Sequence, residues 1–120
     1  MNKESVQQII DVSDKLKVLN VQKLRAQERF ESNTIIGHNG GLFKVDSTFL
    51  TYINYLLQIG KTSDEVVLDS NNLPTLISNV NEFHKKIQDT YYTALDVYHT
   101  DITELNRLKR SVANYIDLGS

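Results

Sequence analysis

Hydrophobic positions recur every three or four residues over two long stretches of the chain. In residues 3–32 they are Ile9, Val12, Leu16, Leu19, Ala26 and Phe30, and Lys23 occupies the one polar position of the series. In residues 79–117 they are Val80, Phe83, Ile87, Tyr91, Ala94, Tyr98, Ile102, Leu105, Leu108, Val112 and Ile116. This spacing is typical of a helix packed along another helix. The pattern predicts two long helices, the second starting at a cap formed by Ser78 or Asn79.

Between these stretches the apolar runs are short and separated by turns. Residues 34–45 contain two β-prone runs around a turn rich in Gly and Asn, which predicts a hairpin. Residues 47–59 form a broad apolar face and predict a short helix, with Asp46 as its N-cap and Gly60 at its end. Residues 65–77 predict strand–turn–strand, in which Pro74 makes the second strand short or an edge strand.

These elements predict a single domain, residues 1–120, that is mainly α with a small β content. We expect two long antiparallel helices, a short middle helix, and one or two β-hairpins at one end. Nearly forty helical residues span roughly 60 Å, whereas a compact chain of this length has a radius of gyration of about 14 Å. Part of the apolar stripe on the last helix is therefore expected to meet another protein chain. The candidate interface residues are Tyr91, Tyr98, Ile102, Leu105 and Val112.

Composition narrows the kinds of partner. The 120 residues include 13 basic and 15 acidic side chains, for a net charge of −2. No segment forms the basic stripe that nucleic-acid binding usually needs, so we expect no nucleic-acid partner. The most apolar segment, residues 49–59, is too short and too polar to cross a bilayer, so we expect no membrane partner.

The same composition bears on the compartment. Cysteine is absent, which excludes disulfides and thiolate chemistry and fits a reducing compartment. The polar residues 1–5 do not resemble a signal peptide. We therefore expect a cytoplasmic protein.

Motifs that would carry chemistry are incomplete. Gly60-Lys61-Thr62 resembles the end of a phosphate-binding loop, but Tyr55 stands where the motif needs Gly. Residues 69–74 resemble the start of a calcium loop, but Pro74 and Val80 replace its Gly and Glu. The spacing of the three histidines does not match a zinc site; they are His38, His84 and His99. The sequence therefore predicts no catalytic residue, no cofactor and no metal, and a protein that is not an enzyme.

Aromatic and basic residues of the last helix have a simpler interpretation than nucleic-acid binding. A base-stacking surface needs cations among its aromatic side chains. The charges nearest the tyrosines are instead Asp89, Asp96 and Asp101. Residues 107–110 contain three cations, which suit the C-terminal end of a helix dipole.

Several short runs resemble small uncharacterised proteins of T-even-type marine tailed phages. They are residues 41–46, 67–74 and 108–112, together with Phe83, Tyr91-Tyr92 and Tyr98, within residues 34–118. The resemblance implies a phage origin, a virion-associated or assembly role, and a location in the host cytoplasm or the virion. The layout also resembles prefoldin-type chaperone subunits, in which β-hairpins join two long helices and build an oligomeric platform. The apolar middle helix departs from that layout, and fold analogy does not establish function.

The sequence leaves three functional hypotheses. The first is a structural or assembly protein that forms homo-oligomers through its long helices. The second is a holdase-like chaperone or adaptor that binds other protein chains. An enzyme or a nucleic-acid factor is the least favoured. The sequence also leaves open whether the last helix bends between residues 90 and 103, where four threonines lower the helix propensity.

Overall fold

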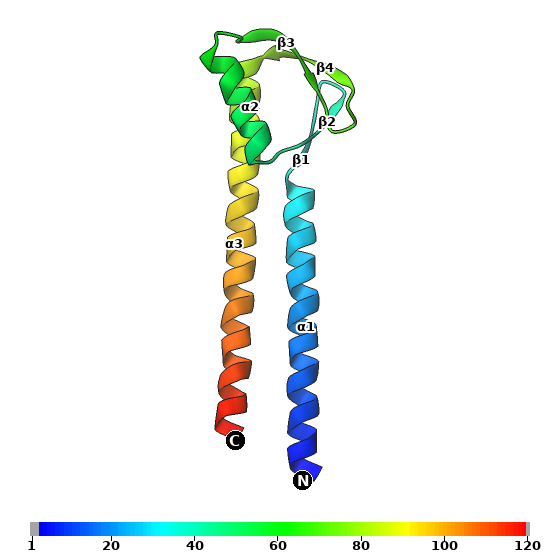
Figure 1. Cartoon of the computed structure of the whole chain (residues 1–120), viewed down its shortest axis with the longest axis vertical. Helices are drawn as coiled ribbons and strands as arrows, with labels where there is room; N and C mark the ends of the chain where they lie inside the picture. The colour runs from blue at the N-terminus through cyan, green and yellow to red at the C-terminus, as the bar shows by residue number, and fades with distance from the viewer. Residues whose placement is uncertain (1–2, 120) are drawn as a thin grey trace. The chain divides into compact units, whose positions relative to one another are not determined.

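The chain folds into three helices and two antiparallel hairpins (Figure 1). The computed structural model describes the backbone of residues 3–119 and the side chains of residues 6, 7 and 9–114. In chain order the elements are α1 (Lys3–Asn33), β1 (Ile35–His38), β2 (Gly41–Lys44), α2 (Ser47–Gln58), β3 (Ser63–Leu68), β4 (Pro74–Asn79) and α3 (Val80–Gly119). The predicted fold class is confirmed, and α3 is one helix through residues 90–103.

Residues group into two compact units, which we describe separately. Unit 1 contains Met1–Arg29 and Val97–Ser120, and unit 2 contains Phe30–Asp96. Each long helix therefore contributes one part to each unit.

Unit 1 is an antiparallel pair of helical segments. Arg29 Nη1 lies 2.7 Å from Asp101 Oδ2. Both residues are close, in sequence, to the points where the two segments continue into unit 2. Farther along, Val18 and Leu19 of α1 share a groove with Val112 of α3. Among the described side chains of this unit, Ala26 alone is a fully buried apolar residue, with 3% of its surface exposed. The segments therefore pair without burying a continuous core.

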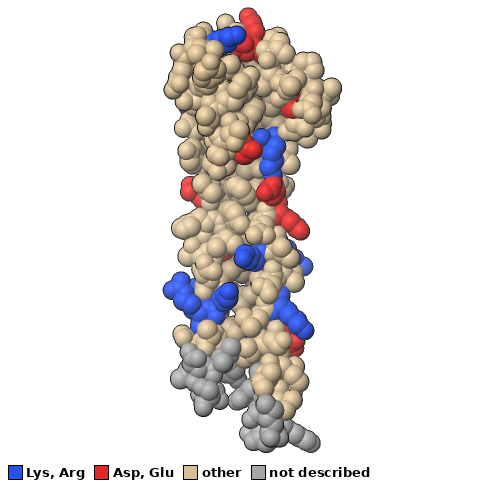
Figure 2. Space-filling view, in the orientation of Figure 1, with Lys and Arg blue, Asp and Glu red and all other residues tan. Residues whose placement is uncertain are grey.

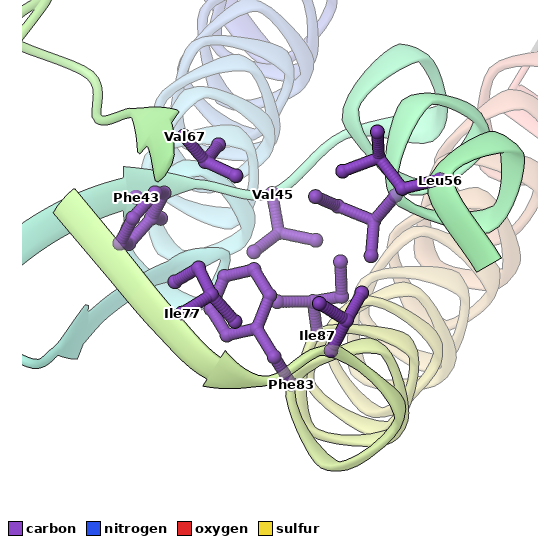
Figure 3. Close-up of a cluster of buried hydrophobic side chains, with 9 residues drawn as sticks. Phe43, Val45, Leu56, Val67, Ile77, Phe83 and Ile87 are labelled. Carbon is purple, nitrogen blue, oxygen red and sulfur yellow. The ribbon is translucent and has the colours of Figure 1, made fainter. Parts of the chain in front are cut away.

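Unit 2 holds the main hydrophobic core. Side chains from both hairpins, α2 and the start of α3 converge there (Figure 3). The core residues are Phe43, Val45, Ile53, Leu56, Val67, Ile77, Val80, Phe83 and Ile87. Phe83 stacks edge-on against Phe43 and Phe49, with ring centroids 5.2 and 6.0 Å apart. The apolar face of α2 thus contributes Ile53 and Leu56 to the core.

The first hairpin turns at Asn39-Gly40, inside the predicted Gly- and Asn-rich turn, and its strands extend further into that turn than the sequence predicts. His38 is paired with Gly41, which leaves two turn residues, Asn39 at φ 50° and Gly40 at φ 82°. Positive φ at both central positions defines the type I′ turn that suits a right-twisted hairpin.

The second hairpin is longer than the sequence predicts. β3 begins at Ser63 rather than at residue 65, and β4 continues to Asn79 rather than ending at residue 77. The physical reason lies in Asn79, which pairs with Ser63 and also caps α3 by accepting the Glu82 N–H at 3.1 Å. Strand and helix therefore follow each other without a loop.

Caps fix both ends of α2. The carboxylate of Asp46 accepts the Phe49 N–H at 2.7 Å, as predicted for the N-cap. At the other end Gly60 has φ 85° and donates its N–H to Leu57 O at 3.1 Å, while Lys61 donates to Leu56 O at 2.9 Å. This pair of bonds is the Schellman arrangement, in which a residue of positive φ satisfies the last carbonyls of a helix.

Candidate protein-binding surfaces

Four of the five predicted interface residues lie in unit 1 and one lies in unit 2. Tyr98, Ile102, Leu105 and Val112 are half-buried in unit 1. Tyr91 packs against the core of unit 2, with its ring centroid 6.3 Å from that of Phe30. None of the five is fully exposed, because neighbouring side chains of the same unit already cover part of each.

An apolar groove runs between the two helical segments of unit 1. Its volume is about 560 Å³, and its described lining residues are Asp14, Lys15, Val18, Leu19, Gln22, Leu108, Ser111 and Val112. Helical residues advance by roughly 100°, so Ser111 lies on one side of Leu108, and Leu105 and Ile102 lie on the other. The groove therefore adjoins the predicted stripe on α3 and shares Leu108 and Val112 with it.

α1 also carries exposed apolar side chains outside the predicted interface. Val18, Val21 and Leu24 expose 54%, 47% and 58% of their surface. They fall outside the three-and-four spacing that identified the packing stripe.

Figure 2 shows that Lys and Arg side chains gather over unit 1, whereas the surface of unit 2 in this view is mostly uncharged.

In unit 2 the outward face of the β3–β4 hairpin is apolar. Val66 lies opposite Leu76, and Leu68 lies opposite Pro74. Val66 and Leu68 expose 61% and 59% of their surface, whereas Val67 between them is buried in the core. The sequence predicted a strand at residues 66–68, but it did not indicate which side chains of that strand face outward.

The two edges of this hairpin differ. At the β4 edge the Asn39 side chain donates to Leu76 O at 2.7 Å. At the hairpin turn the Asp69 N–H donates to Leu73 O at 2.9 Å. Because hydrogen-bonded and non-hydrogen-bonded pairs alternate along an antiparallel ladder, the backbone groups of Val66 and Leu68 then point away from β4. Neither residue has a backbone hydrogen bond on that side within the described part of the chain. The β3 edge is therefore open.

Asp69 joins the second hairpin to the first. Its Oδ1 accepts the N–H groups of Asn71 and Leu73 at 2.9 Å each, and its Oδ2 accepts the Leu42 N–H at 3.2 Å. Ser70 adds a second link, since its N–H donates to Leu42 O at 2.8 Å. The Leu73 N–H, followed by those of Leu42 and Asn71, lowers the pKa of the Asp69 carboxyl below its usual value. A turn that resembles a calcium loop in sequence thus uses its first carboxylate to bind backbone.

His38 takes part in packing between β1 and α3. Its ring centroid lies 4.7 Å from that of Phe83, and Lys86 Nζ lies 3.4 Å from His38 Nδ1. Lys86 also donates to Gly37 O at 3.0 Å. Burial, and secondarily the charge of Lys86, lowers the pKa of His38. The neutral ring is the form that this contact favours.

Within the described part of the chain, no three His, Asp or Glu side chains lie close enough together to hold a metal ion. None of its helices combines the length and the hydropathy needed to cross a bilayer. The surfaces that stand out are the groove of unit 1 and the apolar face and open edge of the β3–β4 hairpin. Comparison with known protein families, curated proteins and solved structures finds no match to this chain.

Proposed function

We propose that this chain is a non-enzymatic structural or assembly protein that binds further copies of itself through the two helical segments of unit 1. One observation carries the proposal. Among the described residues, unit 1 fully buries a single apolar side chain, Ala26, whereas unit 2 fully buries ten.

Helices of this kind need more packing than unit 1 supplies. Most helical stability in proteins comes from the burial of an apolar face rather than from intrinsic propensity. Each buried aliphatic side chain contributes about 1.5–3 kcal/mol, and Leu19, Leu105 and Leu108 are only half-buried. A second helix pair from another copy gives a four-helix arrangement in which each helix can bury one full stripe.

The test is absolute mass in solution, measured by light scattering after size exclusion over a wide range of concentrations. We expect a dimer or a higher oligomer. The double substitution Ile102→Asp and Leu105→Asp places two charges in the proposed interface and is expected to reduce the mass to that of one chain.

A matched control adds the same charges elsewhere on the same helix. Thr103 and Asn106 are exposed, so Thr103→Asp with Asn106→Asp is expected to leave the mass unchanged. Circular dichroism verifies that both variants keep their helices. A single chain at every concentration, or an oligomer that persists in the first variant, contradicts the proposal.

An adaptor or holdase-like chaperone is the second candidate, favoured by the apolar groove of unit 1. Its described lining is largely aliphatic, and a segment of another protein fits it as well as a second copy does. Suppression of a client protein's aggregation at stoichiometric amounts supports this function, and failure with several unrelated clients argues against it.

We also propose that the chain acts in phage assembly, in the host cytoplasm or in the virion. The resemblance of residues 41–46, 67–74 and 108–112 to small phage proteins supports a role in phage assembly. Co-purification with virions, tested on particles from cells that express the chain, separates a virion component from an assembly factor that stays in the host.

A further inference from the structure

We infer that the open edge of β3 is a docking site for an extended peptide segment of another protein, apolar at alternate positions and basic at its C-terminal end. This inference does not rest on the proposed self-assembly, which uses unit 1. It concerns unit 2 and a different kind of partner.

Backbone geometry provides the first argument. The N–H and C=O groups of Val66 and Leu68 point away from β4 and have no backbone partner among the described residues. Such a row of alternating donors and acceptors matches the edge of another strand, and strand addition is a recurring way to bind peptides.

The side chains beside this edge specify the alternation. An added strand continues the outward face formed by Val66, Leu68 and Leu76, all of which are exposed. Every second side chain of the peptide lies beside this face and gains from being apolar. The side chains between them lie on the opposite face of the strand, where polar residues are tolerated.

The acidic edge favours a basic end of the peptide, and antiparallel pairing, the more stable arrangement per residue, determines which end that is. Asp64, at the beginning of β3, is exposed and forms no ion pair with any side chain that the structure describes. Residues 30–96 carry eight acidic and four basic side chains. In an antiparallel pair the C-terminal end of the peptide lies beside Asp64, so a lysine there is attracted both by Asp64 and by the acidic unit.

The same charges disfavour a second copy of β3 as the occupant. β3 contains Asp64 and Glu65 but no cation. Antiparallel pairing centred on Val67 places Glu65 opposite Asp69 of the other copy, and pairing centred on Val66 places Asp64 opposite Leu68. Neither register supplies a positive charge, whereas like charges placed opposite each other are destabilising.

The probe is a short fluorescent peptide that alternates Val and Thr and ends in two C-terminal lysines. Its binding to the full chain is measured by fluorescence anisotropy at low salt. Three altered peptides are each expected to bind at least about threefold more weakly. Moving the lysines to the N-terminus removes the positive charge from the end beside Asp64, replacing them by glutamates reverses that charge, and a central Pro removes a backbone donor.

Protein variants locate the site. Val66→Lys is expected to weaken binding about tenfold or more, whereas Val18→Lys, at a similarly exposed position in unit 1, changes it less than about twofold. Asp64 has φ 52°, which Asn tolerates, so Asp64→Asn removes the charge without forcing the backbone to change. We expect it to weaken binding about two- to threefold, and Asp89→Asn is the matched control.

Hydrogen exchange supplies a readout that depends on strand addition alone. The peptide is expected to protect the amides of Val66 and Leu68, whereas the Val67 amide, which faces β4, is already protected. Equal binding of the Pro peptide, no loss of binding in Val66→Lys, or no added protection at Val66 and Leu68 overturns the inference. So does a lower mass of the Val66→Lys protein without peptide, because β3 is then a contact between copies.

Discussion

Asp69 shows how one side chain connects two local structures. It receives three backbone N–H groups, two from its own turn and one from Leu42, 27 residues earlier in the chain. Leu42 lies at a non-hydrogen-bonded position of the β1–β2 ladder, so its N–H and C=O face outward, where Asp69 and Ser70 meet them. The turn of the second hairpin therefore satisfies the outward-facing backbone groups of Leu42 at the edge of the first.

Acid is expected to weaken this connection. The hydrogen bonds hold the pKa of Asp69 below its unfolded value. As the pH falls, the unfolded chain takes up the proton first. The contribution of Asp69 to the free energy of unfolding is therefore complete above about pH 4 and is lost as the pH falls through the folded value. Asp69→Asn is expected to lower the urea midpoint at pH 7 and to flatten its decline in acid.

Urea titrations monitored by circular dichroism from pH 7 to pH 2 measure both effects. Asp89→Asn, at an exposed position of α3, serves as the control and is expected to follow the parent protein. An Asp69→Asn protein with the same midpoint and acid response as the parent rules out this role for Asp69.

At the scale of elements, the ends of α2 are determined by residues outside its apolar face. Asp46 satisfies an N–H of the first turn, and Gly60 allows the carbonyls of Leu56 and Leu57 to be satisfied at the last turn. Because α2 contributes Ile53 and Leu56 to the core, the place where it ends affects the packing of unit 2.

A methyl group at Gly60 is expected to strain this end. Gly60→Ala keeps the space open but imposes a left-handed conformation on an L-residue, at a cost of about 1 kcal/mol. Gly37→Ala is the control, because its φ is not positive and the nearest atom to an added Cβ is 3.9 Å away. Thermal unfolding followed by circular dichroism compares the two, and an equal effect of both substitutions contradicts the explanation.

Sequence patterns predicted most elements because their signals are local. The Asn39-Gly40 turn, the Asp46 and Gly60 caps and the three-and-four spacing of α3 each operate within a few residues. The limits of β3 and β4 depend instead on the pairing of Ser63 with Asn79, which are distant in sequence. For the same reason no sequence pattern indicated that Asp69 would bind Leu42, or which strand edge would remain open.

At the scale of the whole molecule, the buried apolar residues are unevenly distributed. Ten of the eleven described ones lie in unit 2. The apolar stripes that identified α1 and α3 in the sequence continue into unit 1, but there the described side chains other than Ala26 are half-buried or exposed. A periodic pattern reports that a helix has an apolar face, whereas the depth of burial depends on what covers that face.

Local stability is expected to follow this distribution. In dilute protein, the amides of residues 9–24 and 104–113 are expected to exchange with solvent at least about tenfold faster than those of residues 83–94, because few apolar contacts oppose their opening. Hydrogen exchange monitored by NMR or mass spectrometry measures this. Self-association is expected to slow exchange in unit 1 as the concentration rises, and equal protection of both units contradicts the expectation.

The location of Pro74 has a consequence for aggregation. Proline has no N–H, and Pro74 stands opposite Leu68 at a position whose backbone faces away from β3, so the ladder loses no bond. The loss is on the outer side of β4, where Asn39 also occupies the carbonyl of Leu76. That side is a poor template for a neighbouring strand, so we expect the hairpin to extend on the β3 side. Fibril growth through these hairpins requires strands to stack on both sides, and we therefore expect Pro74 and Asn39 to oppose it.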